Sequence, residues 1–305
     1  MLLKVLKLMN QLIMISKLIK QLVQLRNAII YNKWDFLAKF NHSLFKVNSE
    51  AQFVVSIASY PKRAHLLPAV FEALNTQKVV PQKWILVLSE EEWPALILPS
   101  YLNKLVKRGI EIVWVQQNTF AVKKLVPVIE KYPDLGIITL DDDIIYHKNL
   151  IQGILKQKSQ TPKAIIGYVG KVMVKKESQL HMYYREKNAA NSKTPSNQVY
   201  LIGWGGIYYP PYSLHEKVLN MKEIHRIVPG RGSDIWFWAA AIANGTSQLC
   251  LGMPVAYNLG IAIPQNNQTK PKDRPKTDVL LDRFQMTIDY FGIREKLLAT
   301  LPNQD

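Results

Sequence analysis

The chain has 305 residues, 48% of them apolar and 20% charged, and a formal net charge of +16 at pH 7. This composition excludes an intrinsically disordered chain, while the charge predicts attraction to nucleic acid, anionic lipid or a nucleotide diphosphate. A single cysteine, Cys250, excludes an intrachain disulfide and is expected in the core. With no pattern typical of a cleavable signal peptide, these features predict a cytosolic protein.

Residues 2–30 are predicted to form a basic amphipathic helix. The apolar residues that recur at steps of three and four are Val5, Leu8, Leu12, Ile15, Ile19, Leu22 and Ile29, with Arg26 interrupting the series between the last two. The only charged residues are Lys4, Lys7, Lys17, Lys20 and Arg26. The charges interrupt the apolar run too often for a membrane-spanning helix. We expect the helix to lie on an anionic membrane surface; self-association and packing on the body are the alternatives. Residues 31–51 are expected to form a short helix and a connector.

Residues 53–74 are predicted to form a first strand-loop-helix unit. Phe53 to Ala58 is an apolar strand, and a helix is expected from Leu66 to Leu74. A loop after the first strand of a nucleotide-binding sheet faces the ligand. Here Ser59, Tyr60 and Arg63 offer a hydroxyl, a stacking ring and a guanidinium group, although a basic surface turn would show the same residues.

Further strands are expected at residues 84–88 and 110–115, and they alternate with helices as in a doubly wound, mostly parallel sheet. Ile137 to Leu140 reads as a buried strand of that sheet, and Asp141, Asp142 and Asp143 follow at its end. Open α/β sheets bind ligands at such strand ends. Carboxylate oxygens suit Mg²⁺ or Mn²⁺, whereas a solvated acidic turn is the structural alternative.

Two later segments contain candidate site residues. Residues 203–211, GWGGIYYPP, place three glycines around Trp204, which permits either close backbone approach to a ligand or a bulge around a core tryptophan. Asp234 lies in the first turn of an apolar helix that runs to Gly245. Its carboxylate is explained either by the helix dipole or by a role as general base.

Five segments together resemble GT-A glycosyltransferases, in particular the family-2-like bacterial enzymes that build lipopolysaccharide or capsule. In chain order they are VVSIASYPKR (54–63), KKLVPVIEKYPD (123–134), IITLDDDIIY (137–146), GWGGIYYPP (203–211) and SDIWFW (233–238), within a region of about residues 52–260. The resemblance implies a Rossmann-like, mostly parallel sheet flanked by helices. It also implies metal-dependent transfer of a sugar, with inversion, from a nucleotide-diphosphate sugar such as a UDP-sugar to a saccharide or lipid-linked acceptor.

The resemblance implies roles residue by residue. Asp143 and Asp141 would hold the metal, and Asp234 would be the general base. The remaining implied contacts are, for the nucleotide sugar, Ser59, Tyr60, Arg63, Lys124, Asp141 and Asp142, and for the acceptor, Trp204, Gly205, Gly206 and Trp236. The chain departs from the family's pattern twice: Ser233 stands where another acid is usual, and no histidine follows His225.

Two polar segments lie in the C-terminal half of the chain. Residues 175–198 are expected to form an exposed excursion whose Tyr183, Tyr184 and Arg185 would touch the acceptor or only solvent, and residues 264–278 a mobile loop before a last helix at 279–291. The expected divisions are an extension (1–50), a catalytic domain (51–263) and a C-terminal loop and helix (264–305).

Two other classes of function are alternatives to the glycosyltransferase. The first is a magnesium-dependent nucleotidyltransferase or phosphohydrolase, and the second is a non-enzymatic basic binding protein. GxGxxG and GxxxxGK[ST] motifs are absent, and no helix-turn-helix, zinc-finger or RRM signature is present, so nucleic acid is not an expected partner. The expected location is the inner face of the cell membrane, with a homo-oligomer through the N-terminal helix as a further possibility.

Overall fold

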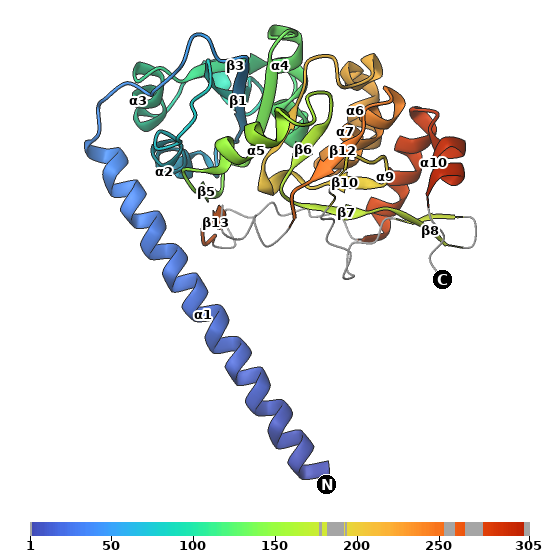
Figure 1. Ribbon diagram of the computed structural model, residues 1–305. Coiled ribbons are helices and arrows are strands. Elements are labelled where there is room, and N and C mark those ends of the chain that lie inside the picture. The colour runs from blue at the N-terminus through green and yellow to red at the C-terminus, as the bar shows by residue number, and fades with distance from the viewer. Residues whose placement is uncertain are drawn as a thin grey trace.

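The computed structural model describes residues 2–176, 179–181, 192, 194–252, 260–265 and 277–301. Its centre is a seven-stranded sheet of order β12-β6-β11-β4-β1-β2-β3. The strands are β1 (Phe53–Ala58), β2 (Trp84–Ser89), β3 (Glu111–Val115), β4 (Gly136–Leu140), β6 (Ile165–Gly167), β11 (Ile207–Tyr209) and β12 (Gln248–Cys250). Only β11 runs antiparallel to its neighbours in this sheet. The predicted α/β fold with a mostly parallel sheet flanked by helices is confirmed (Figure 1).

Helices cover both faces of the sheet because alternate side chains of each strand enter two different cores. In β1, Val54 packs into one core while Val55 and Ile57 pack into the other. The first core contains residues of α4 (Val126–Lys131), α6 (Met221–Ile227), α7 (Ser233–Ala243), α9 (Thr277–Tyr290) and α10 (Arg294–Thr300). The second contains residues of α2 (Leu67–Leu74), α3 (Ser100–Lys107) and α5 (Leu150–Lys158).

Short elements complete the described fold. Three two-stranded sheets pair β5 (Ile144–Tyr146) with β13 (Gly260–Ala262), β7 (Gly170–Val172) with β10 (Val199–Leu201), and β8 (Val174–Lys176) with β9 (Gln179–His181). The 3-10 helices are η1 (Ala64–Leu66), η2 (Pro94–Leu96), η3 (Phe120–Lys124), η4 (Gly203–Gly205) and η5 (Glu216–Leu219). Tyr183, Tyr184, Arg185 and most of the predicted loop at 264–278 lie outside the described residues.

The N-terminal helix α1 (Leu2–Phe40) continues ten residues beyond its predicted end at residue 30. The short helix expected after residue 30 is therefore not a separate element but the end of α1, where Ile30, Tyr31 and Trp34 pack against the core that contains α2, and Ala38 is buried. Lys104 Nζ then donates hydrogen bonds to the last carbonyl groups of α1, at 2.9 Å from Ala38 O and 2.7 Å from Lys39 O.

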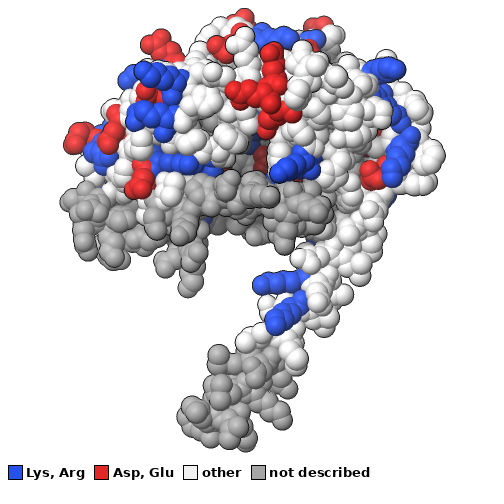
Figure 2. Space-filling view, turned by 180° about the vertical axis from the view of Figure 1, so that it is seen from behind, with Lys and Arg blue, Asp and Glu red and all other residues white. Residues whose placement is uncertain are grey.

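The N-terminal part of α1 projects away from the body (Figure 1). Every residue from 13 to 26 is exposed, so packing of the whole helix on the body is excluded. The described side chains of this part include cationic groups and no acidic ones (Figure 2). At the junction, Asn27 Nδ2 donates a hydrogen bond of 2.9 Å to the carbonyl of Ala262 in β13. No helix among the described residues combines the length and the apolar character needed to cross a membrane.

Candidate active site

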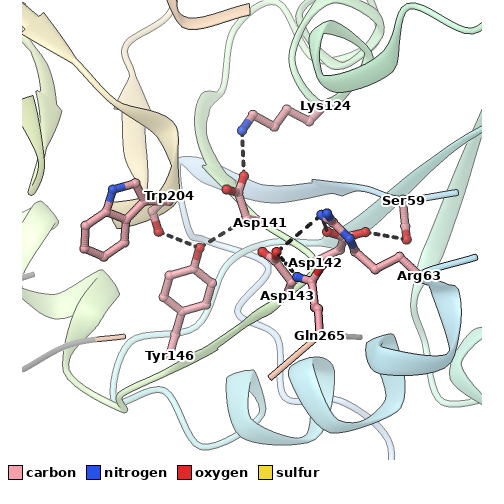
Figure 3. Close-up of polar contacts among 9 residues, drawn as sticks. All are labelled: Ser59, Arg63, Lys124, Asp141, Asp142, Asp143, Tyr146, Trp204 and Gln265. Carbon is pink, nitrogen blue, oxygen red and sulfur yellow. Dashed lines mark hydrogen bonds and ion pairs between the residues drawn. The ribbon is translucent and has the colours of Figure 1, made fainter. Parts of the chain in front are cut away.

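Three consecutive acids, Asp141 to Asp143, connect β4 to β5, and each carboxylate has different partners (Figure 3). Asp142 is the most buried, at 3% exposure. It accepts a hydrogen bond of 2.6 Å from Ser59 Oγ and one of 2.7 Å from Arg63 Nη1. Burial raises the pKa of Asp142 to about 6, although Arg63 acts in the opposite direction. Asp142 thus anchors the loop after β1.

Asp141 points toward the opposite side of the site. Its Oδ1 lies 2.8 Å from Lys124 Nζ, which comes from η3 and is only 5% exposed. The backbone N–H of Asp141 donates to the hydroxyl oxygen of Tyr146 at 3.0 Å, and that hydroxyl donates to Trp204 O at 3.0 Å. Tyr146, the last residue of β5, and Trp204 in η4 therefore fix the backbone of Asp141 (Figure 3).

Asp143 lies beside Arg63, with Oδ2 3.4 Å from Nη1, and accepts a hydrogen bond from Gln265 Nε2. Its backbone carbonyl accepts from Ile263 N at 2.9 Å, so the segment after β13 holds this acid at two points. Burial, followed by repulsion from Asp141, raises the pKa of Asp143. The two outer carboxylates therefore remain close enough to repel each other, even with Lys124 and Arg63 present.

The loop after β1 supplies the first wall of the site. The guanidinium carbon of Arg63 lies 5.3 Å from the centre of the Tyr60 ring, which is a cation-π arrangement. Asp142 and Asp143 raise the pKa of Arg63 against the effect of its burial. Arg63 therefore stays charged between an aromatic face and two carboxylates.

Asp234 lies at the start of α7, close to Lys124. Its Oδ2 accepts a hydrogen bond of 3.2 Å from Gly203 N. A Cβ at Gly203 would lie 2.9 Å from Lys124 Nζ and 3.0 Å from Asp234 Oδ1, so any larger residue would displace this pair. Burial raises the pKa of Asp234, and Lys124 lowers it. Lys124 thus acts on two acids, one on each side of the site.

A cavity of about 600 Å³ adjoins these groups. The predicted residues that line it are Ser59, Tyr60, Arg63, Lys124, Asp141 and Asp142. A second cavity, of about 460 Å³, lies at the other end of β4 beside Leu135 and Ile137 and shares none of these groups. The donor-site prediction therefore placed six residues from three separate segments around one space.

The cavity has further lining residues that sequence reasoning missed. Lys123, buried at 2% exposure, lies 2.5 Å from Glu92 Oε2 and donates to Asn118 Oδ1 at 3.0 Å. Phe120 is 46% exposed at the rim and has a φ of 53°, which a bulky residue rarely adopts. Glu92 belongs to an acidic run that resembles a helix start, and no sequence signal identifies Phe120.

Most of the predicted acceptor residues are buried in the core. Trp236 is a core residue with no exposed surface: its Nε1 donates to Val218 O at 3.0 Å and its ring stacks on Tyr290, so its acceptor role is wrong. Gly205 and Gly206 are also buried, and a Cβ would meet Val169 at 2.5 Å and Leu140 at 3.0 Å respectively. These two glycines serve core packing. Trp204 is partly exposed, and its carbonyl supports Tyr146.

Asp141 and Asp143 are the residues that would hold a divalent cation. The described residues contain no group of three or more His, Cys, Asp or Glu side chains that could hold a metal by themselves. Mg²⁺ is commonly bound by one or two carboxylates plus phosphate oxygens and water, so this donor set fits such an ion. The repulsion between Asp141 and Asp143 also indicates a cation site, because a bound cation would remove this repulsion.

No protein-family model and no curated protein sequence matches the chain. Among solved structures, Staphylococcus aureus TarS 1–349 in complex with UDP is similar at 13% identity and a TM-score of 0.38, over 65% of this chain and 57% of that one. The chain thus spans less than two thirds of that TarS fragment. CMP:2-keto-3-deoxy-manno-octonic acid synthetase complexed with CTP is similar at 11% identity and a TM-score of 0.39, over 68% of this chain and 96% of that one. These similarities concern the fold alone.

Proposed function

We propose that the chain is a metal-dependent glycosyltransferase that moves a sugar, with inversion, from a nucleotide-diphosphate sugar to a saccharide or lipid-linked acceptor. The observation that carries the proposal is the placement of Lys124 between two acids. Lys124 pairs with Asp141 of the acidic cluster and acts on Asp234 at the start of α7. A donor-side carboxylate and a candidate base therefore share one buried cation next to a cavity of about 600 Å³.

The donor half of the site is formed by the loop after β1 and by the acidic cluster. Tyr60 offers a ring for stacking on a base, and the charged Arg63 lies at the same wall as a partner for phosphate. Asp141 and Asp143 would hold Mg²⁺ or Mn²⁺, which when bound supplies charge neutralisation for the leaving diphosphate. Asp142 keeps Arg63 and Ser59 in position through its two hydrogen bonds.

The acceptor half depends on Asp234. A general base works best when its pKa lies near the working pH, and burial raises the pKa of Asp234 toward that range. The N–H of Gly203 orients the carboxylate of Asp234, and the charge of Lys124 acts on it. In this role Asp234 accepts the proton of the acceptor hydroxyl as the sugar is transferred from the opposite side.

The proposal includes attachment to the inner membrane face, where surface-polysaccharide acceptors would be presented. The described residues 13–26 of α1 are exposed, contain Lys17, Lys20 and Arg26, and lack acids. A cation near an anionic surface contributes about 1 kcal/mol, and burial of apolar side chains adds to it. Asn27 at the base of this segment bonds to Ala262, three residues before Gln265, the partner of Asp143. An attached helix would therefore hold the site close to the surface.

The test is an activity assay with a panel of nucleotide sugars, saccharide acceptors and Mn²⁺. We expect donor consumption only when an acceptor is present, and a product whose anomeric configuration, read by NMR, is opposite to that of the donor. Consumption without acceptor would indicate a phosphohydrolase, and pyrophosphate release from a nucleoside triphosphate would indicate a nucleotidyltransferase. Retention of configuration would contradict the role of Asp234.

A further inference from the structure

Two arginines lie next to each other beside the candidate base. Arg231 belongs to the turn between α6 and α7, three residues before Asp234, and Arg283 comes from α9. Arg283 Nη1 donates a hydrogen bond of 2.5 Å to Arg231 O. The residue before Arg231, Gly230, lines the cavity of the candidate active site. Arg231 therefore follows a residue that lines the cavity, and its charge also lowers the pKa of Asp234, the acid that would activate the acceptor.

The backbone around Arg231 has a conformation that two glycines make possible. Gly230 and Gly232 have φ angles of 76° and 120°, which side chains other than glycine rarely adopt. A Cβ at Gly232 would lie 3.0 Å from Val228 Cγ1 and 3.9 Å from Arg283 Cδ. This turn therefore packs closely against Arg283 and presents Arg231, which is exposed, beside it.

Neither guanidinium is paired with a carboxylate in the part of the chain that the structure describes. Four other described arginines, Arg63, Arg108, Arg226 and Arg294, each lie within 3.5 Å of an acidic side chain. Burial lowers the pKa of Arg283, and the positive charge of Arg231 lowers it further. Among the described residues, the hydrogen bond to Arg231 O occupies one of the five N–H donors of Arg283.

We propose that Arg231 and Arg283 bind a phosphate group of the acceptor. The inference rests on the proposed function, because it is the acceptor that must lie beside Asp234. Two guanidinium groups present planar forks of donors and two positive charges, which match the geometry and the charge of a phosphate better than those of a single carboxylate. A phosphate held here places a hydroxyl of the same molecule near Asp234. The phosphate belongs either to a phosphorylated saccharide or to a lipid-linked one.

The test measures binding to the full chain, with UDP and Mn²⁺ present, of three probes: glucose 6-phosphate, glucose and farnesyl phosphate. We expect wild type to bind the phosphorylated probes more tightly than glucose. Arg231→Gln should weaken phosphate binding about tenfold, since a hydrogen bond to a charged group is lost. Arg231→Lys, which retains the charge and loses the fork, should weaken it less. A preference for glucose 6-phosphate over farnesyl phosphate assigns the phosphate to a saccharide, and the reverse assigns it to a lipid.

Arg226→Gln is the matched control because Arg226 is exposed and, unlike Arg231, is paired with an acid, Glu223. It should bind all three probes as wild type does. Arg231→Gln keeps the backbone carbonyl that receives Arg283, so its fold is expected to be intact, as a thermal melt would verify. Equal phosphate binding by Arg231→Gln and wild type would overturn the inference. If wild type bound neither phosphorylated probe more tightly than glucose, the inference would also be overturned.

Failure of the inference is distinguishable from failure of the proposed function. If sugar transfer occurs and Arg231→Gln transfers to phosphorylated acceptors as wild type does, the phosphate site is refuted and the transferase stands. If Arg231→Gln loses phosphate binding while no nucleotide sugar is consumed by wild type, the anion site is supported and its role toward a transferase acceptor is refuted.

Discussion

The buried ammonium group of Lys124 lies 2.8 Å from the carboxylate of Asp141, and this ion pair joins the two halves of the site. Lys124 comes from η3 and Asp141 from the end of β4. Asp141 and then Asp234 raise the pKa of Lys124 against the effect of its burial, so the lysine stays charged. One cation thus lowers the electrostatic cost of keeping two acids ionised in the same region.

Lys124→Met should move the acidic limb of the pH profile of kcat/KM to higher pH. Lys124 lowers the pKa of Asp234, so removing the cation raises that pKa further. Because the base acts in its deprotonated form, activity would then be lost at a higher pH as the solution is acidified. The profile of Lys131→Met, which removes an exposed lysine paired with Glu111, is the control. An unchanged acidic limb in Lys124→Met would show that Lys124 does not influence the pKa of the base.

Asp234→Asn should lower kcat by about 10² or more, with donor affinity little changed, because base catalysis typically contributes about 10² to 10⁴. Asparagine can still accept the hydrogen bond from Gly203 N, so the fold around α7 should persist. Asp289→Asn, at an exposed ion pair with Arg294, is the control. A kcat within about tenfold of wild type would exclude Asp234 as the base.

Arg108→Met should lower the free energy of unfolding by about 3–5 kcal/mol, because it leaves a buried carboxylate without its cation. Arg108 Nη1 lies 2.8 Å from Glu72 Oε2, and the two side chains are only 3% and 7% exposed. Arg226→Met breaks an exposed pair instead and should cost less than about 1 kcal/mol. Chemical denaturation of both variants measures the difference. Equal losses would mean that the buried pair adds nothing.

Deletion of residues 2–26 should abolish binding to anionic vesicles. The truncation keeps residues 27–40, because Ile30, Tyr31 and Trp34 pack on the body and their loss would expose the core. Sedimentation of the full chain with anionic vesicles should decrease at high salt, since surface charges are screened. The double variant Lys17→Glu, Lys20→Glu should also sediment less with anionic vesicles, because it replaces two cationic groups with anionic ones. If full chain and truncation sediment equally, a comparison of their masses in solution tests self-association.

The sheet could be predicted from the sequence because its signals are local. β1 begins and ends where its apolar run does, and β2 and β3 differ from the prediction by one residue each. The end of α1 could not be predicted, because packing of Ile30 and Trp34 on distant parts of the chain extends the helix. The local sequence pattern was therefore sufficient to predict the bounds of a buried strand. It was insufficient to predict the end of a helix that tertiary contacts extend.

The candidate site shows the same division. Strand ends and their loops predicted Ser59, Arg63 and Asp142 at the ligand-binding edge, the family resemblance assigned them to one donor site, and the structure brings them within hydrogen-bonding distance. Trp236 was misassigned because α7 is apolar on all sides, so its sequence does not indicate which side faces the site. Arg283 was missed because it lies 52 residues from Arg231 and no local pattern connects them.

The most direct test of the central claim is calorimetric binding of a panel of nucleotide sugars, with and without Mn²⁺, to wild type and to Asp143→Asn. Asp143 accepts from Gln265 and lies near Arg63, and asparagine retains an oxygen for both contacts, so the variant should fold. We predict that wild type binds at least one nucleotide sugar in a Mn²⁺-dependent manner, and that Asp143→Asn loses this dependence together with turnover. Binding that is independent of Mn²⁺ in wild type, or full Mn²⁺-dependent turnover by Asp143→Asn, would contradict it.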